Sequence, residues 1–491
     1  MTCSDVQLTR DPFERIFHPE NIVIFGVSTK WNMFGSGILN SLLAIGYPGG
    51  IYLINPKGGQ YQGMTIYRDL NEVPAAVDFA IIAVPAGAVA QTLEQCRLKG
   101  VAGAEVLSSG FSEMGTEEGE ALEREVQEIA ARGIRVIGPN CFGIYCPESG
   151  LTLMPGPDLS RESGPVGFIS QSGGMSVDFA HIGTWMGIRF SKIISFGNGA
   201  DLREIELLDY FRQDEQTRII SLYVEGVKDA RGFLAALARA ARVKPVIVNK
   251  GGLSEAGKRA VASHTASLGG SRIIWESALR QAGAIQVGDI WELAQCCLAF
   301  SLLPVRPYHG VAVAGPGGAF GVSACDEAER FGLELPRLER EISDRILDVL
   351  PRPGSSAINP IDAANPFVTP QAYKEVLLQA AQDPRVDIQV LISLLHHFKA
   401  LAIGFGSEMK DVVTYPELAR VAGEVREQTG KPIVLVLPNY KQGEESLDIE
   451  AAIRDARSVF LEHGVPVFSD LDEALRAVSH VSRYALWRDR S

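Results

Sequence analysis

The chain contains no long hydrophobic run, and it has few cysteines for its length. No charge-free apolar stretch reaches the ~18 residues that a membrane-spanning helix needs, so we expect no membrane partner. The first residues lack the apolar segment of a secretory signal peptide. The seven cysteines are scattered, and their spacing fits neither a paired Cys-x-x-Cys zinc site nor a disulfide framework. We therefore expect reduced thiols, no metal site and a cytoplasmic location.

The chain also lacks the positive charge of a nucleic-acid-binding protein. Its formal net charge is −13 at pH 7, whereas a phosphate backbone requires clustered Lys and Arg side chains. We expect no nucleic-acid partner, although a local basic pocket for a phosphorylated ligand remains compatible with this charge. The length of 491 residues predicts about two to four domains of ~100–200 residues each.

Two nucleotide-binding motifs are missing. The turn after the first predicted strand reads Gly26-Val27-Ser28-Thr29-Lys30, without the Gly-x-Gly-x-x-Gly of dinucleotide-binding proteins. This absence disfavours NAD and leaves another nucleotide-bearing ligand open. The chain also has no Gly-x-x-x-x-Gly-Lys-Ser/Thr loop for the phosphates of ATP.

Short apolar runs alternate with helical patterns almost throughout the chain. This alternation is typical of βαβ units and predicts an α/β protein with parallel sheets in three blocks. Residues 166–187 and 311–332 are equal in length, and each predicts a strand, a Gly-rich turn and a helix. The predicted strands are Asn21–Gly26, Gly50–Ile54, Phe79–Val84, Gly103–Leu107, Arg135–Ile137, Val166–Ser170, Ile193–Phe196, Ile219–Val224, Pro245–Asn249, Gly310–Ala314, Ile388–Ser393, Pro432–Leu437 and Val465–Phe468. Two of the predicted helices of the first block are Gly35–Ile45 and Val89–Lys99.

Polar residues and prolines follow the strands of the first block. Lys57 ends the second strand, Pro85 follows the third, and Asn140 follows the last. Because the carboxyl ends of parallel strands meet at one edge of a sheet, we expect these loops to outline one ligand groove. Lys57 could meet a phosphate of the ligand there.

The segment Ser170-Gln171-Ser172-Gly173-Gly174 follows a predicted strand and begins a helix. A helix N-terminus leaves backbone N–H groups unpaired and carries a partial positive charge. Together with two hydroxyls, it forms a site that favours an anion. The alternative is an ordinary N-cap with a glycine turn.

Glu225 stands at the end of a predicted buried strand, in Tyr223-Val224-Glu225-Gly226. A carboxylate there can accept an N–H from an imidazole and fix its tautomer; the alternative is a solvated carboxylate. His264 lies among small and hydroxyl residues, Ser263 to Gly270. These neighbours allow a phosphate-sized group to approach the ring, as a nucleophilic imidazole requires; the alternative is an ordinary loop histidine.

These motifs, in this order, resemble the NDP-forming acyl-CoA synthetases, relatives of succinyl-CoA synthetase. The resemblance is to the α-type part and covers about residues 12–485. It is carried by GVS (26–28), INPK (54–57), SSGFSEMG (108–115), GPNCFG (138–143), SQSGG (170–174), SFGNGADL (195–202), YVEG (223–226), KPVIVNKGG (244–252) and SHTASLGG (263–270). It implies a Rossmann-like CoA-binding domain (1–150), a flavodoxin-like ligase domain with the phosphohistidine loop (151–303) and a second such domain (304–491).

The resemblance also assigns roles to individual residues. It implies that His264 is the phosphohistidine, that Glu225 supports it, and that CoA lies in the first-block groove. The helix N-terminus that holds the phosphate corresponds to Ser170, Ser172, Gly173 and Gly174. The expected CoA contacts are Ser28, Lys57, Pro85 and Asn140. One departure is Ala266, because the family usually has glycine after the threonine of this loop.

The activity implied is an acid–thiol ligase, which interconverts acyl-CoA, phosphate and NDP with a carboxylic acid, CoA and NTP. The family's ATP-grasp part has no counterpart in this sequence. The resemblance therefore implies a separate ATP-grasp β subunit that holds ATP or ADP with Mg²⁺, and an oligomer. Two alternatives stay open: a silent regulatory paralogue that binds CoA or acyl-CoA, and a CoA-dependent acyl or carbamoyl transferase.

Overall fold

The computed structural model describes residues 10–156, 158–265 and 271–490, without the side chains of residues 262–265. The chain divides into two compact units, Met1–Leu293 and Ala294–Ser491. No helix among the described residues is long and apolar enough to cross a membrane.

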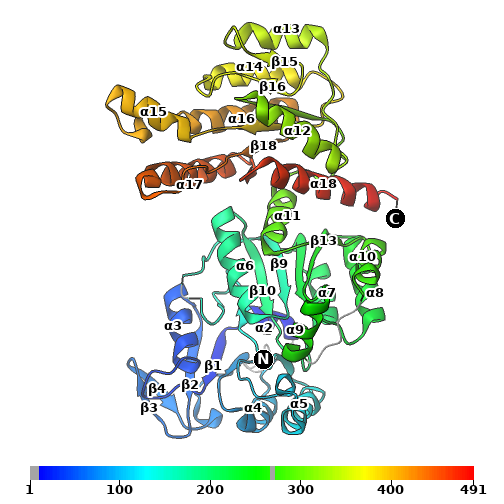
Figure 1. The fold of residues 1–491 in the computed structure, drawn as a ribbon. Helices are drawn as coiled ribbons and strands as arrows, with labels where there is room; N and C mark the ends of the chain where they lie inside the picture. Colours follow the sequence, from blue (N-terminus) through cyan, green and yellow to red (C-terminus); the bar gives the residue numbers. More distant parts are fainter. Residues whose placement is uncertain (1–9, 157, 266–270, 491) are drawn as a thin grey trace. The chain divides into compact units, whose positions relative to one another are not determined.

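The first unit begins with a seven-stranded sheet of order β3-β4-β2-β1-β5-β6-β7. Six of these strands, in the order β4-β2-β1-β5-β6-β7, are parallel neighbours, and only β3 is antiparallel to its partner β4. Figure 1 shows α4 and α5 side by side, with α3 on the opposite face. The strands are β1 (Asn21–Phe25), β2 (Gly50–Ile54), β3 (Gly59–Tyr61), β4 (Met64–Tyr67), β5 (Phe79–Ile82), β6 (Gly103–Val106) and β7 (Arg135–Ile137). The helices are α2 (Pro12–Phe17), α3 (Gly35–Ile45), α4 (Ala86–Leu98) and α5 (Glu117–Ala130), with short turns η1 (Leu70–Glu72) and η2 (Ser112–Met114).

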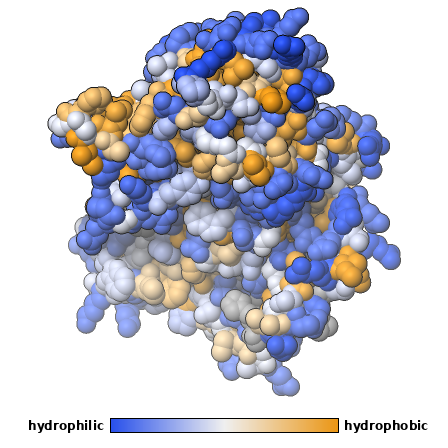
Figure 2. Space-filling view, turned by 45° about the horizontal axis from the view of Figure 1, so that its top comes forward, coloured by the Kyte–Doolittle hydropathy of each residue, from blue (hydrophilic) through white to orange (hydrophobic). Residues whose placement is uncertain are grey.

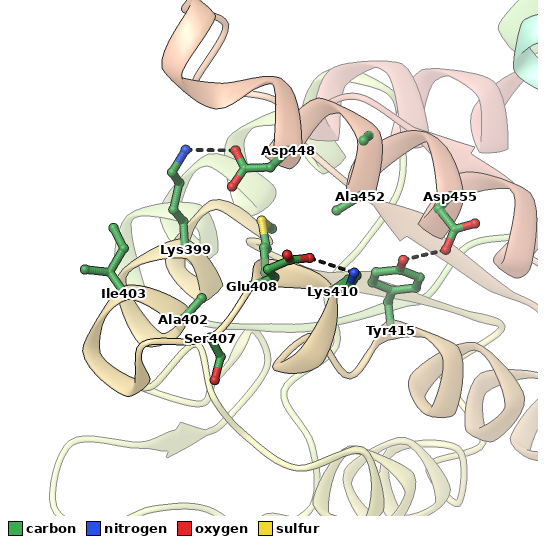
Figure 3. Close-up of a pocket in the computed structure, with 12 residues that line it drawn as sticks. Lys399, Ala402, Ile403, Ser407, Glu408, Lys410, Tyr415, Asp448, Ala452 and Asp455 are labelled. Carbon is green, nitrogen blue, oxygen red and sulfur yellow. Dashed lines mark hydrogen bonds and ion pairs between the residues drawn. The ribbon is translucent and has the colours of Figure 1, made fainter.

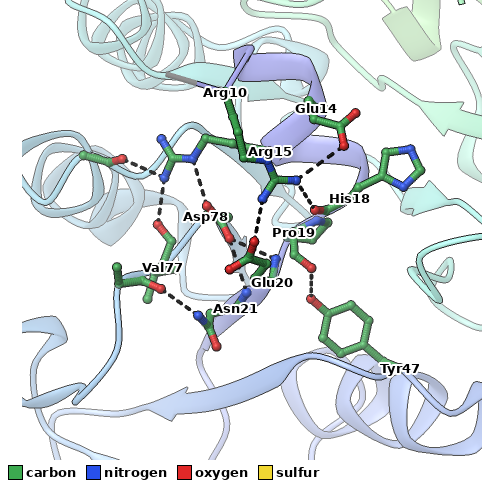
Figure 4. Close-up of polar contacts among 12 residues, drawn as sticks. Arg10, Glu14, Arg15, His18, Pro19, Glu20, Asn21, Tyr47, Val77 and Asp78 are labelled. Atoms are coloured by element: carbon green, nitrogen blue, oxygen red, sulfur yellow. Dashed lines mark hydrogen bonds and ion pairs between the residues drawn. The ribbon is translucent and has the colours of Figure 1, made fainter. Parts of the chain in front are cut away.

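A buried ion pair fixes α2 to this sheet (Figure 4). Arg15 Nε donates to Asp78 Oδ1 at 2.8 Å, and the exposed fractions of the two residues are 8% and 0%. Asp78 Oδ2 accepts the backbone N–H of Glu20 at 2.9 Å and that of Asn21 at 3.4 Å. Buried charges are tolerated when they are paired and hydrogen-bonded. The pair therefore sets where β1 begins.

The second sheet of the first unit has the order β13-β12-β11-β9-β10-β8. All its pairs are parallel except β8 with β10. Its strands are β8 (Gly143–Tyr145), β9 (Ser163–Ser170), β10 (Phe190–Ser195), β11 (Ile219–Val224), β12 (Val246–Lys250) and β13 (Ile285–Val287). Its helices are α6 (Gly173–Met186), α7 (Glu204–Gln213), α8 (Ala230–Ala241), α9 (Glu255–Thr265) and α10 (Arg272–Gln281). Figure 1 shows α7 and α8 side by side on one face and α6 on the other.

The second unit contains a third sheet of order β15-β16-β14-β17-β18-β19. Only the pair β15–β16 is antiparallel. Its strands are β14 (Val311–Gly315), β15 (Ser356–Ala357), β16 (Ile361–Asp362), β17 (Ile388–Ile392), β18 (Ile433–Val436) and β19 (Val467–Phe468). The helices are α12 (Gly318–Arg330), α13 (Arg340–Val349), α14 (Pro370–Ala380), α15 (His396–Phe405), α16 (Tyr415–Thr429), α17 (Leu447–Glu462) and α18 (Leu471–Arg488), with turns η3 (Met409–Asp411) and η4 (Glu444–Ser446). Helix α11 (Ile290–Leu302) contains the boundary between the units.

These three mostly parallel sheets confirm the predicted α/β class. β8 belongs to the second sheet, although it precedes residue 150, where the sequence predicts the first domain to end. The domain boundaries at 150 and 303 stay predictions.

Candidate active site

The turn between β9 and α6 is built by its own two serines. Ser170 Oγ donates to the backbone oxygen of Ser172 at 2.7 Å and accepts the N–H of Ser172 at 3.2 Å. Ser172 is the N-cap of α6, and its Oγ accepts the N–H of Met175 at 3.4 Å. Both hydroxyls are therefore engaged with the backbone of the turn. The N-terminal amides of α6 are the groups that this arrangement offers to an anion.

The two glycines of this turn differ in what requires them. A Cβ on Gly173 would stand 2.7 Å from ring atoms of Phe142, so close packing excludes a side chain there. A Cβ on Gly174 would meet nothing closer than Ser172 Oγ at 4.0 Å. Gly174 thus leaves open space beside the first turn of α6.

Gln171 joins this turn to the loop that carries Glu225. Its side-chain Oε1 accepts the backbone N–H of Glu225 at 2.8 Å and that of Gly226 at 3.2 Å. Its own N–H donates to the backbone oxygen of Tyr223 at 3.1 Å, beyond the parallel pair of β9 and β11. The structure therefore brings the predicted phosphate turn and Glu225 together. Sequence reasoning did not single out Gln171, whose only signal was its place inside Ser-Gln-Ser-Gly-Gly.

Glu225 is 9% exposed and lies between an aromatic hydroxyl and a lysine. Tyr223 Oη donates to Glu225 Oε1 at 3.1 Å. Burial, followed by the Glu225 charge, raises the pKa of Tyr223 far above its usual value, so the phenol stays protonated and remains a donor. Lys250 Nζ donates to the backbone oxygen of Glu225 at 2.7 Å and to that of Gly251.

Lys250 is a second residue that sequence reasoning passed over. It is 5% exposed, and its Nζ lies 5.0 Å from the centre of the Trp275 ring. Burial lowers the pKa of Lys250 to about 8, against the opposing effect of the Glu225 carboxylate. The signal in the sequence was a lysine at the end of a predicted buried strand.

His264 belongs to α9, whose backbone lies against η2 of the first sheet's loops. The side chain of His264 and residues 266–270, including Ala266, lie outside the described residues. The pairing of His264 with Glu225 therefore stays a prediction.

The four predicted CoA residues lie along one edge of the first sheet. Ser28 follows β1, Lys57 follows β2, Pro85 is the N-cap of α4 after β5, and Asn140 follows β7. Ser28 Oγ donates to the backbone oxygen of Lys30 at 2.6 Å, and Lys57 and Pro85 are exposed. The parallel strands place these loops side by side, while their contacts with CoA stay predictions.

Glycines allow these loops to approach one another closely. Gly26 has φ +98°, and a Cβ there would stand 2.1 Å from the backbone oxygen of Ala83. A Cβ on Gly35, the first residue of α3, would stand 2.7 Å from the backbone oxygen of Gly26. Asn140 has φ +56°, and its N–H donates to the backbone oxygen of Ser108 at 2.9 Å. The loops at this edge of the sheet therefore pack backbone against backbone.

Comparisons with known proteins identify the family. Residues 20–147 match the model of a CoA binding domain, and residues 163–300 match that of a succinyl-CoA ligase like flavodoxin domain. The chain is 33% identical to the α subunit of acetate–CoA ligase [ADP-forming] I from Pyrococcus furiosus, over 97% of this chain and 98% of that one. The chain belongs to the family of ADP-forming acyl-CoA ligase α subunits. This confirms the predicted family and the predicted enzyme class, an acid–thiol ligase.

Two further relatives are a solved structure of similar length and a longer ligase. The chain is similar to a solved acetyl-coenzyme A synthetase from Ca. Korarchaeum cryptofilum in complex with phosphate and ADP, with a TM-score of 0.82, 31% identity and 97% of each chain covered. It is 33% identical to acetate–CoA ligase [ADP-forming] I from Archaeoglobus fulgidus over 96% of this chain. It covers 64% of that relative's length, so the longer ligase contains a part that this chain does not match.

A pocket of about 450 Å³ in the second unit of this ligase chain holds none of the predicted site residues (Figure 3). Its charged groups are paired: Lys399 with Asp448 at 2.8 Å and Lys410 with Glu408 at 2.6 Å. Ile403 of α15 also lines this pocket and is 71% exposed. The face drawn in Figure 2 is mostly hydrophilic, with separate hydrophobic patches. Among the described residues, no group of three His, Cys, Asp or Glu could hold a metal ion.

Proposed function

We propose that this chain is the α subunit of an ADP-forming acyl-CoA ligase that carries a phosphoryl group on His264. The observation that supports the proposal best is the Gln171 bridge, which holds the α6 N-terminus beside Glu225. A phosphohistidine needs two features at neighbouring strand ends: a site that binds the phosphoryl anion, and a buried carboxylate that supports the ring. Family membership over 97% of the chain supports the same reaction.

In the direction of NTP synthesis, the reaction divides into three reversible steps. A phosphate oxygen attacks the carbonyl of acyl-CoA, and CoA leaves as the thiolate, which gives acyl phosphate. A ring nitrogen of His264 then attacks phosphorus, and the carboxylate of the acid leaves. Finally an oxygen of NDP attacks the phosphohistidine, and the neutral imidazole is restored. Histidine suits this carrier role because much of it is neutral and nucleophilic near pH 7.

The site residues divide the work between charge and geometry. The amides at Gly173 and Gly174 would meet the phosphoryl charge at the start of α6. Glu225 would accept the N–H of the His264 ring, which fixes the tautomer that attacks with the other nitrogen. Gln171, Tyr223 and Lys250 hold Glu225 in place.

CoA would lie along the first-sheet edge, within the matched CoA-binding domain. We propose Ser28, Lys57, Pro85 and Asn140 as its contacts. Lys57 is exposed, so its ammonium group would be accessible to a CoA phosphate. Glycines at positions 26 and 35 allow the loops of this edge to pack closely against one another.

The nucleotide would be held by a separate subunit. The P. furiosus relative is itself named an α subunit, and the A. fulgidus relative carries additional length beyond its match to this chain. We propose an ATP-grasp β subunit that binds ADP or ATP with Mg²⁺, in an oligomer, in the cytoplasm. The acyl group would be that of a small carboxylic acid, since both relatives are named for acetate.

The proposal is tested by phosphoenzyme formation. The pure chain is incubated with labelled phosphate and a panel of acyl-CoAs, beside His264→Ala. We expect an acid-labile, alkali-stable label in the wild type and none in the variant. Binding of CoA without a label, even when a β subunit and labelled ATP are supplied, would favour a silent regulatory paralogue. Acyl exchange that survives His264→Ala would favour a CoA-dependent transferase.

A further inference from the structure

Asn198 lies where the loop after β10 meets the loop after β7. The N–H of Asn198 donates to the backbone oxygen of Pro139 at 3.0 Å, and that of Ala200 donates to Gly138 at 2.9 Å. A Cβ on Gly197 would stand 2.3 Å from the backbone oxygen of Asn140. The two loops therefore run backbone against backbone, without room for an intervening side chain.

The side chain of Asn198 reaches four further residues, the first of which is Ser112, whose Oγ lies 3.4 Å from Asn198 Nδ2. Its Nδ2 donates to Glu113 Oε2 at 2.6 Å and to Glu123 Oε2 at 2.9 Å. Its Oδ1 accepts from Asn140 Nδ2 at 3.3 Å. Arg203 fixes the backbone of the loop by donating to the oxygen of Asn198 at 3.0 Å. A primary amide is suited to this position, because it donates two hydrogens and accepts at its oxygen.

The two carboxylates in turn shape the turn that precedes α5. Glu113 Oε1 accepts the N–H of Gly110 at 2.6 Å. Glu123 is 4% exposed, and its Oε2 accepts the hydroxyl and the N–H of Ser112. This turn includes η2, and α9 lies against η2. A chain of contacts therefore runs from Asn140 through Asn198 to the helix that carries His264.

We propose that Asn198 is a positioning residue that couples the CoA groove to α9. It holds Asn140 through its carbonyl oxygen, and it holds the turn beneath α9 through its amide. The inference rests on the proposed function, in which Asn140 contacts CoA and α9 carries the phosphohistidine. CoA bound at Asn140 would then stabilise α9 in the position where His264 receives the phosphoryl group.

The first test measures CoA binding by calorimetry, which needs neither phosphate nor His264. Loss of hydrogen bonds to charged partners in Asn198→Ala should weaken CoA binding by about 10-fold or more. Asn198→Asp should weaken CoA binding further near neutral pH, because a third carboxylate would then face those of Glu113 and Glu123. The cations near these carboxylates are Arg203 and Lys228. Acidification from pH ~8 to ~5 should restore part of the affinity of this variant, as a carboxyl among carboxylates titrates high.

The second test measures hydrogen–deuterium exchange of peptides within 255–265. CoA should slow their exchange in the wild type and have no effect in Asn198→Ala. Asn71→Ala is the matched control, because the Asn71 amide also donates to a carboxylate, that of Asp69, and Asn71 is not among the proposed CoA contacts. The control should bind CoA as the wild type does, and thermal melting of every variant separates these effects from misfolding.

The outcomes distinguish the inference from the proposed function. A wild type that does not bind CoA would overturn both. If the wild type binds CoA and the Asn198 variants bind it with an affinity within about twofold, the inference alone would be overturned. Equal protection of α9 by CoA in the wild type and in Asn198→Ala would overturn it as well. A wild type that binds CoA but forms no phosphoenzyme would overturn the role of His264. The hydrogen–deuterium exchange of α9 would then decide whether Asn198 couples CoA binding to this helix.

Discussion

Gln171 provides the sharpest test of how the site is held together. Its Oε1 accepts two backbone N–H groups, those of Glu225 and Gly226, and both of these residues are buried. Replacement by alanine leaves both donors without this partner, at about 1–3 kcal/mol for each buried group. Since Gln171 is itself half-buried, water can reach part of the gap, and we expect the lower end of the sum, about 2 kcal/mol of lost unfolding free energy.

Gln171→Glu separates the mechanical role from the electrostatic one. A carboxylate oxygen can accept the same two N–H groups, so this variant should unfold near the wild-type urea concentration. Its negative charge stands beside the α6 N-terminus and Glu225, where it should repel a phosphate and weaken phosphoenzyme formation by about 10-fold or more.

The assay pairs urea unfolding followed by tryptophan fluorescence with labelled-phosphate incorporation at His264. The expected result is a crossed pattern, in which alanine mainly lowers stability and glutamate mainly lowers labelling. An alanine variant that loses less than about 0.5 kcal/mol, or a glutamate variant with wild-type labelling, would refute the reasoning.

Two further predictions concern buried carboxyl groups of the first sheet. Asp78→Asn should leave the Arg15 guanidinium without its ionic partner and lower the unfolding free energy by about 3–5 kcal/mol, which urea titration beside a half-buried Asp69→Asn control would measure. Burial raises the pKa of Glu105 from 4.5 to about 8, so between these pH values the folded state keeps a proton on Glu105 that the unfolded state has lost. The contribution of this protonated carboxyl to the free energy of unfolding is therefore lost as pH rises from about 4.5 to about 8. Glu105→Gln keeps an oxygen for the Ile144 N–H and should flatten this part of the melting curve against pH; an unchanged slope would contradict the burial argument.

Much of the fold could be predicted from local sequence. The bounds of α3, β2 and β11 match the sequence prediction residue for residue. Each is a well-bounded pattern: Gly50–Ile54 and Ile219–Val224 are short apolar runs in a parallel sheet, and Gly35–Ile45 ends at a left-handed Gly46. β8 was missed, because a three-residue antiparallel edge strand carries no periodicity of its own.

The site was predicted less completely, and for a different reason. The phosphate turn and Glu225 were recognised because each stands directly after a buried strand. Gln171 and Asn198 were not, because their partners lie 54 and 85 positions away in the chain. Local patterns reveal which strand a residue follows, but only the sheet order determines which loops become neighbours. The roles of His264 and of the CoA contacts stay predictions.

The packing of Gly173 against Phe142 has a consequence for how this family can vary. The glycine of the phosphate turn is required by an aromatic ring from the loop after β7, and no ligand needs to be invoked for it. A larger residue at position 173 would be tolerated only together with a smaller one at position 142. The two positions therefore form a suppressor pair: across related sequences they should change jointly or not at all, so the loop after β7 restricts which residues the turn between β9 and α6 can accept.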